Sequence, residues 1–336
     1  MTDGLREPAT LGIGCVRLGH PSSGGRRAGV RLVHRALDLG VMYFDTADSY
    51  GDGSSEQVLG HALAGRRDTA VIATKAGYLF RERSRADQAL RRAGRPLLER
   101  LRRSGGARGA LFRHASSTAY ANQDFSVAHL RSALEASLHR LRTDHVDLYQ
   151  LHGPPGVCGD DVLALMSELT AEGKIRGFGV GLESLDHALE WARLGSLAGL
   201  QIAFGVLDPE AGVSVIPTAV TNSVPVIARG AFASGLLARE SDGDAAWLRP
   251  GQAERRAAVY ATAGDLGVDP LQLATWFVTT TPGVRTLLVG TTSEEHLQQV
   301  VSFAETPPPR GVATWLDRFS RAGAADADRP ATGQQR

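Results

Sequence analysis

Cysteine is scarce in this sequence, because Cys15 and Cys158 are the only two among 336 residues. Two thiols are too few for a disulfide framework or a cysteine-based zinc site, and they are typical of a reducing compartment. Apolar runs of about 18 residues are also absent, and no basic segment followed by an apolar one opens the chain. We therefore expect a cytoplasmic protein that neither spans a membrane nor is secreted, with no metal site.

Net charge is almost absent as well, since 37 basic residues face 36 acidic ones. This balance argues against a nucleic-acid partner. The charge is unevenly spread, however. Between Tyr78 and Phe125 eleven arginines stand against four acidic residues, so this stretch carries +7 and the remainder of the chain −6.

Lysine is the rarest basic residue, because only Lys75 and Lys174 occur among the 37. The arginine bias is typical of a GC-rich coding sequence. A lysine retained against it suggests chemistry that guanidinium cannot supply, since an ammonium is a compact charge with a tunable pKa. Lys174 precedes the fifth predicted strand and is given no catalytic role, so scarcity alone does not identify Lys75 as functional.

Short apolar runs alternate with longer stretches at helical spacing, such as 126–142 and the segment from Ser184 to Arg193. Strands that are apolar on both faces and separated by helices indicate a parallel sheet. Eight such units predict an α/β fold of the (β/α)8 TIM-barrel class. The predicted strands are Leu11–Val16, Val41–Thr46, Val71–Lys75, Val146–Leu151, Ile175–Val180, Leu200–Phe204, Pro225–Arg229 and Arg285–Val289.

An open dinucleotide-binding sheet is the main rival, but its fingerprint is weak here. The segment 177–181 (GFGVG) lacks the last spacing of G-x-G-x-x-G. The P-loop, H-E-x-x-H and G-x-S-x-G motifs are also absent from the sequence. The barrel is therefore the preferred fold.

We expect residues 1–322 to form one barrel domain and residues 323–336 to be a disordered tail. The arginine-rich insertion 78–124, after the third strand, is far longer than an ordinary βα loop. Its middle, 86–103, has leucines that favour a helix.

Four reactive side chains follow neighbouring strands, where barrel active sites lie. Asp45 ends the second predicted strand, Lys75 the third, His152 follows the fourth, and Tyr50 lies just after Asp45. Taken singly, three of them have ordinary structural explanations: Asp45 as a helix-start or turn acid, Tyr50 as a packed aromatic and His152 as a hydrogen-bonded residue before a turn.

Taken together, the four residues suit proton donation to a carbonyl oxygen. A nearby ammonium lowers the pKa of a tyrosine, so Lys75 would tune Tyr50 while Asp45 holds Lys75 in place. His152 would orient the substrate oxygen. Since no side chain supplies hydride, a reduction would require a nicotinamide cofactor.

The sequence resembles the aldo-keto reductase family at these residues. Segment 44–51 (FDTADSYG), 73–75 (ATK) and Leu151-His152 are similar to the family motifs that carry its Asp, Tyr, Lys and His, and the resemblance runs from about Leu11 to Phe303. It implies a barrel that binds NADPH, or alternatively NADH, across its rim, with Tyr50, Asp45, Lys75 and His152 as the catalytic tetrad.

The resemblance also implies cofactor contacts. Gln201 aligns with a nicotinamide-binding Gln, segment 226–237 with the pyrophosphate loop, and segment 290–299 with the loop and helix that grip the adenosine phosphate. The implied cofactor-binding residues are Gln201, Arg229, Gly230, Phe232, Ser234, Gly235, Leu236, Gly290, Thr291, Thr292, Ser293, His296 and Gln299.

Some positions depart from the family pattern. Gly181-Leu182 stand where a Ser-Asn pair is common, Gly205 and Val300 replace asparagines, and Thr292 replaces a basic residue. The insertion lies where relatives place a substrate loop. It is either a basic lid that attracts an anionic substrate or cofactor phosphates, or a solvated helix of an arginine-biased protein.

We therefore expect an NAD(P)H-dependent oxidoreductase that reduces a small, uncharged or anionic aldehyde or ketone, or oxidises the alcohol, in sugar or specialised metabolism. Two alternatives stay open. One is a nicotinamide-binding regulatory or accessory subunit with little catalysis, and the other is a non-redox isomerase or lyase that uses Tyr50 and Lys75.

Overall fold

Eight parallel strands close into a barrel in chain order, with β1 paired to both β2 and β8. The computed structural model describes residues 10–79, 122–237, 248, 251–309, 311–312 and 315. The predicted (β/α)8 fold is confirmed. The strands are β1 (Thr10–Gly14), β2 (Tyr43–Asp45), β3 (Val71–Ala76), β4 (Val146–His152), β5 (Ile175–Gly181), β6 (Gly199–Ala203), β7 (Val226–Arg229) and β8 (Val284–Val289).

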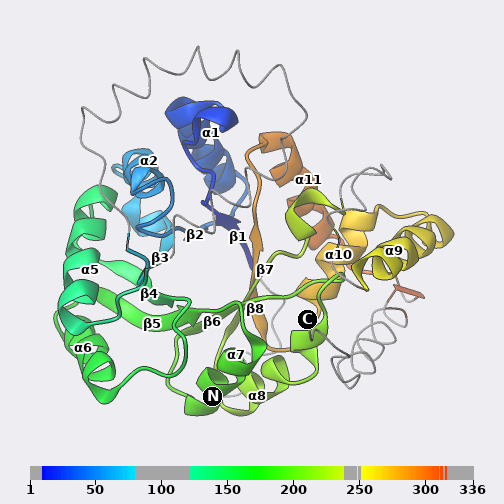
Figure 1. The fold of residues 1–336 in the computed structure, drawn as a ribbon. Helices are drawn as coiled ribbons and strands as arrows, with labels where there is room; N and C mark the ends of the chain where they lie inside the picture. The colour runs from blue at the N-terminus through cyan, green and yellow to red at the C-terminus, as the bar shows by residue number, and fades with distance from the viewer. Residues whose placement is uncertain are drawn as a thin grey trace, which may run out of the picture.

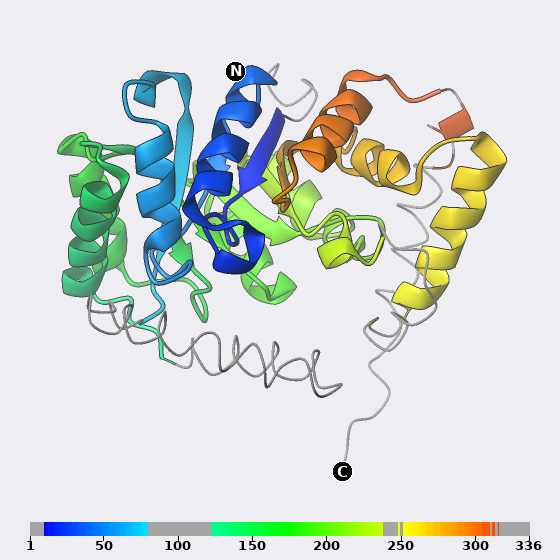
Figure 2. The ribbon, with the colours of Figure 1, turned by 90° about the horizontal axis from the view of Figure 1, so that it is seen from above.

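Helices surround this barrel, and α9 lies at the outer edge of the molecule beyond α10 (Figures 1 and 2). None of the helices in the described part of the chain is long and apolar enough to cross a membrane. The α-helices are α1 (Gly25–Asp38), α2 (Ser54–Ala62), α5 (Val127–Leu141), α6 (Asp160–Ala171), α7 (Leu185–Leu194), α8 (Val215–Thr221), α9 (Gln252–Leu266), α10 (Pro270–Thr279) and α11 (Glu294–Glu305).

The two helices predicted from their patterns begin where their capping residues place them. The Ser126 hydroxyl accepts a hydrogen bond from the His129 amide at the start of α5, and Ser184 does the same for the His187 amide in α7. Such caps satisfy backbone donors that have no partner within the helix. The leucine face of α5 then packs against the barrel, since Leu130, Leu134, Leu138 and Leu141 are buried.

Strand ends differ from the predicted bounds by a few residues. The first strand was predicted to run to Val16, but β1 ends at Gly14, because the chain turns there and the Leu18 amide bonds to the Cys15 carbonyl. Val16 is consequently exposed. β2 is shorter than the predicted 41–46, and β7 begins after Pro225, which has no amide hydrogen to donate.

The glycines of segment 177–181 serve close strand packing. A Cβ on Gly179 would lie 2.3 Å from the Gly199 carbonyl oxygen, and one on Gly177 would lie 2.5 Å from the Ala198 Cβ. Both contacts are impossible for a side chain, so glycine lets β5 approach β6. The closed barrel excludes the open dinucleotide-binding sheet.

The two ends of the insertion meet at the carboxyl mouth of the barrel. Tyr78 and Gln123 form an antiparallel bridge, and the Gln123 Nε2 donates to the main-chain oxygens of His152 and Gly153, at 3.0 and 2.9 Å. The helix predicted within 86–103 and the tail predicted at 323–336 lie outside the described residues.

Candidate active site

The structure brings Asp45, Tyr50, Lys75 and His152 together at the carboxyl ends of β2, β3 and β4. The Lys75 Nζ donates to the Asp45 Oδ2 at 2.6 Å and lies 5.1 Å from the centroid of the Tyr50 ring. The rings of Tyr50 and His152 meet edge to face, with centroids 5.8 Å apart. The register explains the convergence, because parallel neighbours place their last residues at the same rim.

The ion pair between Asp45 and Lys75 is buried, with only 3% and 1% of each residue exposed. Its polar atoms are well supplied with partners. The Asp45 Oδ1 accepts from the Gln150 and Gln201 side-chain amides at 3.1 and 2.9 Å, and the Lys75 Nζ also donates to the Thr46 carbonyl at 2.9 Å. Such additional bonds are what make a buried pair tolerable.

Lys75 is held as an ammonium. Burial opposes its charge, but the Asp45 carboxylate and then Tyr50 outweigh that effect and raise the Lys75 pKa above its ordinary value.

The pKa of Tyr50 requires a correction of the sequence-based expectation. Lys75 does lower this pKa, as expected, but burial is the larger effect and the net pKa is raised above the ordinary value of a tyrosine. Desolvation wins because most of the Tyr50 side chain is withdrawn from water, which disfavours the charged phenolate. Tyr50 is therefore a protonated phenol at neutral pH.

His152 is a neutral imidazole. Burial, followed by the positive charges of Lys75 and Arg229, lowers its pKa well below the ordinary histidine value. The ring lies between two tyrosines, since the Tyr78 ring also meets it edge to face at a centroid distance of 4.6 Å.

Sequence reasoning missed several residues that shape this site. Gln150 lies two residues before His152 on β4, so the alternation of the strand places both on one face, and this signal was in the sequence. Tyr78 was counted only as the start of the insertion. Glu56 follows segment 44–51 within the stretch that resembles the family signature, but it was given no role. It is buried and accepts from Thr74 Oγ1 at 2.5 Å and Arg140 Nε at 2.6 Å.

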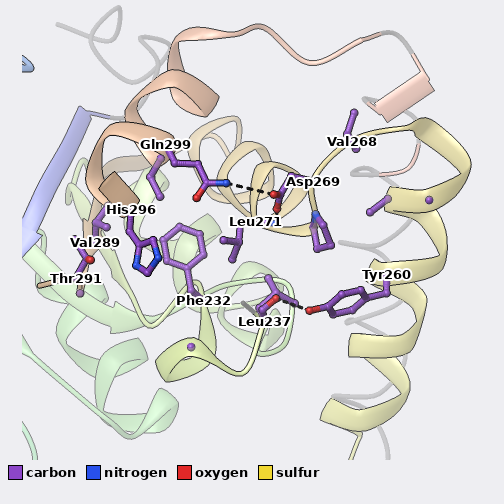
Figure 3. Close-up of a pocket in the computed structure, with 16 residues that line it drawn as sticks. Phe232, Leu237, Tyr260, Val268, Asp269, Leu271, Val289, Thr291, His296 and Gln299 are labelled. Atoms are coloured by element: carbon purple, nitrogen blue, oxygen red, sulfur yellow. Dashed lines mark hydrogen bonds between the residues drawn. The ribbon is translucent and has the colours of Figure 1, made fainter. Parts of the chain in front are cut away.

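A cavity of about 580 Å³ lies between the loop after β7, the end of β8 and helices α9, α10 and α11 (Figure 3). Six of the residues predicted to bind a cofactor line it. Those six are Phe232, Gly235, Gly290, Thr291, His296 and Gln299.

The walls of this cavity suit a nucleoside. Tyr260 and Leu271 supply apolar surface, and Gln299 is fixed by a 3.3 Å bond from its Nε2 to the Asp269 carboxylate (Figure 3). The nearby start of α11 is capped by Ser293, which accepts from the His296 amide. Unpaired amides at such a helix start favour anions.

The remaining predicted cofactor residues lie elsewhere. Gln201 is inside the barrel, bonded to Asp45. Arg229 ends β7, followed by Gly230 at positive φ and by Ser234 and Leu236 in or next to a short 3-10 helix. Thr292 and Ser293 line a separate hollow between α1 and α11.

A closed parallel barrel with a buried ionic cluster at its carboxyl mouth defines the class of this protein as a (β/α)8-barrel enzyme. A family model, described as the aldo/keto reductase family, matches residues 10–312. The chain belongs to this family and is an oxidoreductase of the type that interconverts carbonyl and alcohol groups.

Known proteins resemble the chain over most of its length. It is 28% identical to the uncharacterized oxidoreductase YqkF of Bacillus subtilis, over 88% of this chain and 86% of that one. It is 28% identical to D-threo-aldose 1-dehydrogenase of a Pseudomonas species, over 84% of each. An aldo/keto reductase from Klebsiella pneumoniae, solved in complex with NADP and acetate, matches with a TM-score of 0.65 at 23% identity, over 93% and 91%.

Proposed function

We propose that this protein reduces a small aldehyde or ketone to the alcohol, or runs the reverse oxidation, with NADPH as cofactor and NADH as the alternative. The observation that carries the proposal is the position of Lys75, whose Nζ contacts Asp45 at 2.6 Å and lies over the Tyr50 ring. The similar NADP-bound Klebsiella protein supports the cofactor, and the similar aldose dehydrogenase supports the type of substrate.

Tyr50 is the proton donor in this proposal. Because burial raises its pKa, the phenol is fully protonated before reaction and has a proton to give. As the proton leaves, the Lys75 ammonium stabilises the Tyr50 phenolate. The ammonium does not have to move, because its hydrogen bonds to Asp45 and the Thr46 carbonyl already hold it in place. Charge that is already in place when the phenolate forms lowers the barrier to the proton transfer.

His152 orients the substrate. A neutral imidazole has one N–H to donate, which suits a carbonyl oxygen placed next to the Tyr50 hydroxyl. The Tyr78 and Tyr50 rings fix the plane of His152 from two directions.

When bound, the nicotinamide cofactor supplies the hydride to the carbonyl carbon. The residues that would hold it are Gln201 at the barrel centre and the segment after β7, with the cavity of Figure 3 receiving the adenosine portion. Because Gln201 is bonded to Asp45, cofactor contact and the tetrad would share one hydrogen-bond network.

The test is the substitution Tyr50→Phe, with Tyr43→Phe as its matched control. Both tyrosines are in or just after β2, but only Tyr50 contacts Lys75 and His152. We expect Tyr50→Phe to lower kcat for a carbonyl panel by about 10²–10⁴-fold. NADPH affinity, followed by fluorescence titration, should stay within about threefold, because the lost hydroxyl serves the proton transfer.

Three results would contradict the proposal. Unchanged turnover in Tyr50→Phe would exclude this proton donor. Wild-type protein that binds NADPH but turns over no carbonyl would favour the accessory subunit, a hypothesis motivated by Gly181-Leu182. Turnover without nicotinamide would favour an isomerase or lyase.

A further inference from the structure

Arg229 crosses the mouth of the barrel. It is the last residue of β7, and its Nη2 reaches past β6 to the segment after β5, where it donates to the Leu182 carbonyl at 2.9 Å and pairs with the Glu183 Oε1 at 2.7 Å. Its side chain is 29% exposed. The guanidinium is therefore partly desolvated, which strengthens its interactions with anions.

The charge of Arg229 acts on the reacting end of the site. It lowers the pKa of His152, and it opposes the burial that raises the pKa of Tyr50 and of Tyr78. Three aromatic groups around the substrate position thus feel this cation. Arg229 is not among the residues that line the cavity proposed for the adenosine portion.

The partner of Arg229 is easily displaced. The Glu183 side chain is 82% exposed, and an ion pair with one solvated partner contributes little stability. Among the described residues both Arg229 contacts are made by Nη2, and Nη2 belongs to both guanidinium edges that can bind a carboxylate through two parallel N–H bonds. Displacement of Glu183 would therefore free an Nη2 hydrogen next to Nη1 or Nε for a ligand carboxylate. Guanidinium binds a planar carboxylate through two parallel N–H bonds better than any other side chain.

We propose that Arg229 is a substrate-recognition residue for an anionic group, that Glu183 is the counter-ion which the substrate displaces, and that the preferred substrates are aldehydes or ketones bearing a carboxylate. This inference rests on the proposed function, because it assumes that the carbonyl is reduced at Tyr50. It assigns Arg229 to the substrate, where the resemblance assigned it to the cofactor.

The experiment compares carboxylates with their uncharged esters. With NADPH, kcat/KM is measured for glyoxylate against methyl glyoxylate and for 4-oxobutanoate against methyl 4-oxobutanoate. We expect wild-type protein to favour at least one acid by about tenfold or more, and less so in high salt. Arg229→Gln should lower kcat/KM for that acid by at least about tenfold and leave its ester within about threefold.

Two further variants complete the set. Glu183→Gln removes the competing carboxylate and should raise kcat/KM for the acid by about threefold. Arg176→Gln is the matched control for net charge, since Arg176 is exposed at the start of β5, at the opposite end of the barrel, and it should leave the acid preference unchanged.

Binding measurements separate this inference from the proposed function. Succinate binding by calorimetry, weakened in Arg229→Gln, would support the anion site even in a protein that reduces nothing, and that inactivity would overturn only the proposed function. Equal kcat/KM values for acids and esters in the wild-type protein would contradict the anion site but would leave the proposed reductase function intact. If Arg229→Gln instead weakens NADPH binding and lowers kcat/KM equally for the acid and its ester, Arg229 binds the cofactor and the proposed role in substrate recognition is wrong.

Discussion

Replacing Asp48 by asparagine is expected to stabilise the protein, and the gain should grow with pH. Asp48 is 1% exposed, and neither of its carboxylate oxygens has a hydrogen-bond partner of good geometry in the described part of the chain. Burial and then the nearby Glu56 raise its pKa from 3.8 to about 8. A carboxyl group in this environment is kept protonated at neutral pH.

The sign of the pH dependence follows from this raised pKa. Below pH 4 the carboxyl is protonated in both the folded and unfolded states, so the wild-type protein and the Asp48→Asn variant differ little in electrostatic free energy. As the pH rises from about 4 to about 8, the unfolded state releases its proton while the folded state keeps it, and the wild-type protein loses stability. The loss approaches about 1.4 kcal/mol per pH unit and reaches about 4 kcal/mol at pH 7.

Urea unfolding at pH 5, 6, 7 and 8 measures this difference. The free energy of unfolding of Asp48→Asn should exceed that of wild type by a margin that widens with pH and levels off above pH 8. Asp38→Asn, at the exposed end of α1, is the matched control and should show no widening margin. A margin that is constant or shrinks with pH would refute the assignment of a protonated Asp48.

Two further predictions concern the helix packing and the site. Gly60→Ala should lower the melting temperature, because its Cβ would lie 2.4 Å from the Leu141 carbonyl oxygen. Gly264→Ala, in α9 with open space around it, should instead stabilise the protein by about 0.5–1 kcal/mol, and melting curves in which the two variants behave alike would contradict this packing. Since the pKa of His152 lies well below the ordinary 6.5, kcat/KM should show no loss from histidine protonation between pH 7 and pH 6. A half-maximal loss near pH 6.5 that disappears in His152→Gln would show that the imidazole is not neutral.

The sequence predicted the barrel well because its signals are local. Apolar runs, turn residues and caps such as Ser126 and Ser184 act within a few residues of chain, and the structure follows them. Strand ends were less accurate, because β1 stops where Cys15 and Leu18 form a turn that depends on packing.

The four candidate catalytic residues were recognised from motifs and from the rule that active sites of (β/α)8 barrels lie at the carboxyl ends of the strands. That rule places Asp45, Lys75 and His152 at one rim without stating their distances. Neither the buried ion pair of Glu56 with Arg140 nor the raised pKa of Asp48 could be predicted from the sequence, because each depends on which segments of the chain exclude water from these groups.

The sequence by itself determined the fold class, the family motifs and the order in which reactive groups follow the strands, because these depend on side-chain type and spacing. Only the tertiary structure decided the protonation states of the buried groups and the hydrogen-bond and ion-pair partners of the charged side chains. Burial outweighs Lys75 in setting the pKa of Tyr50, and Arg229 reaches across β6 to Glu183. Desolvation and charge act through space, between residues that the chain keeps far apart.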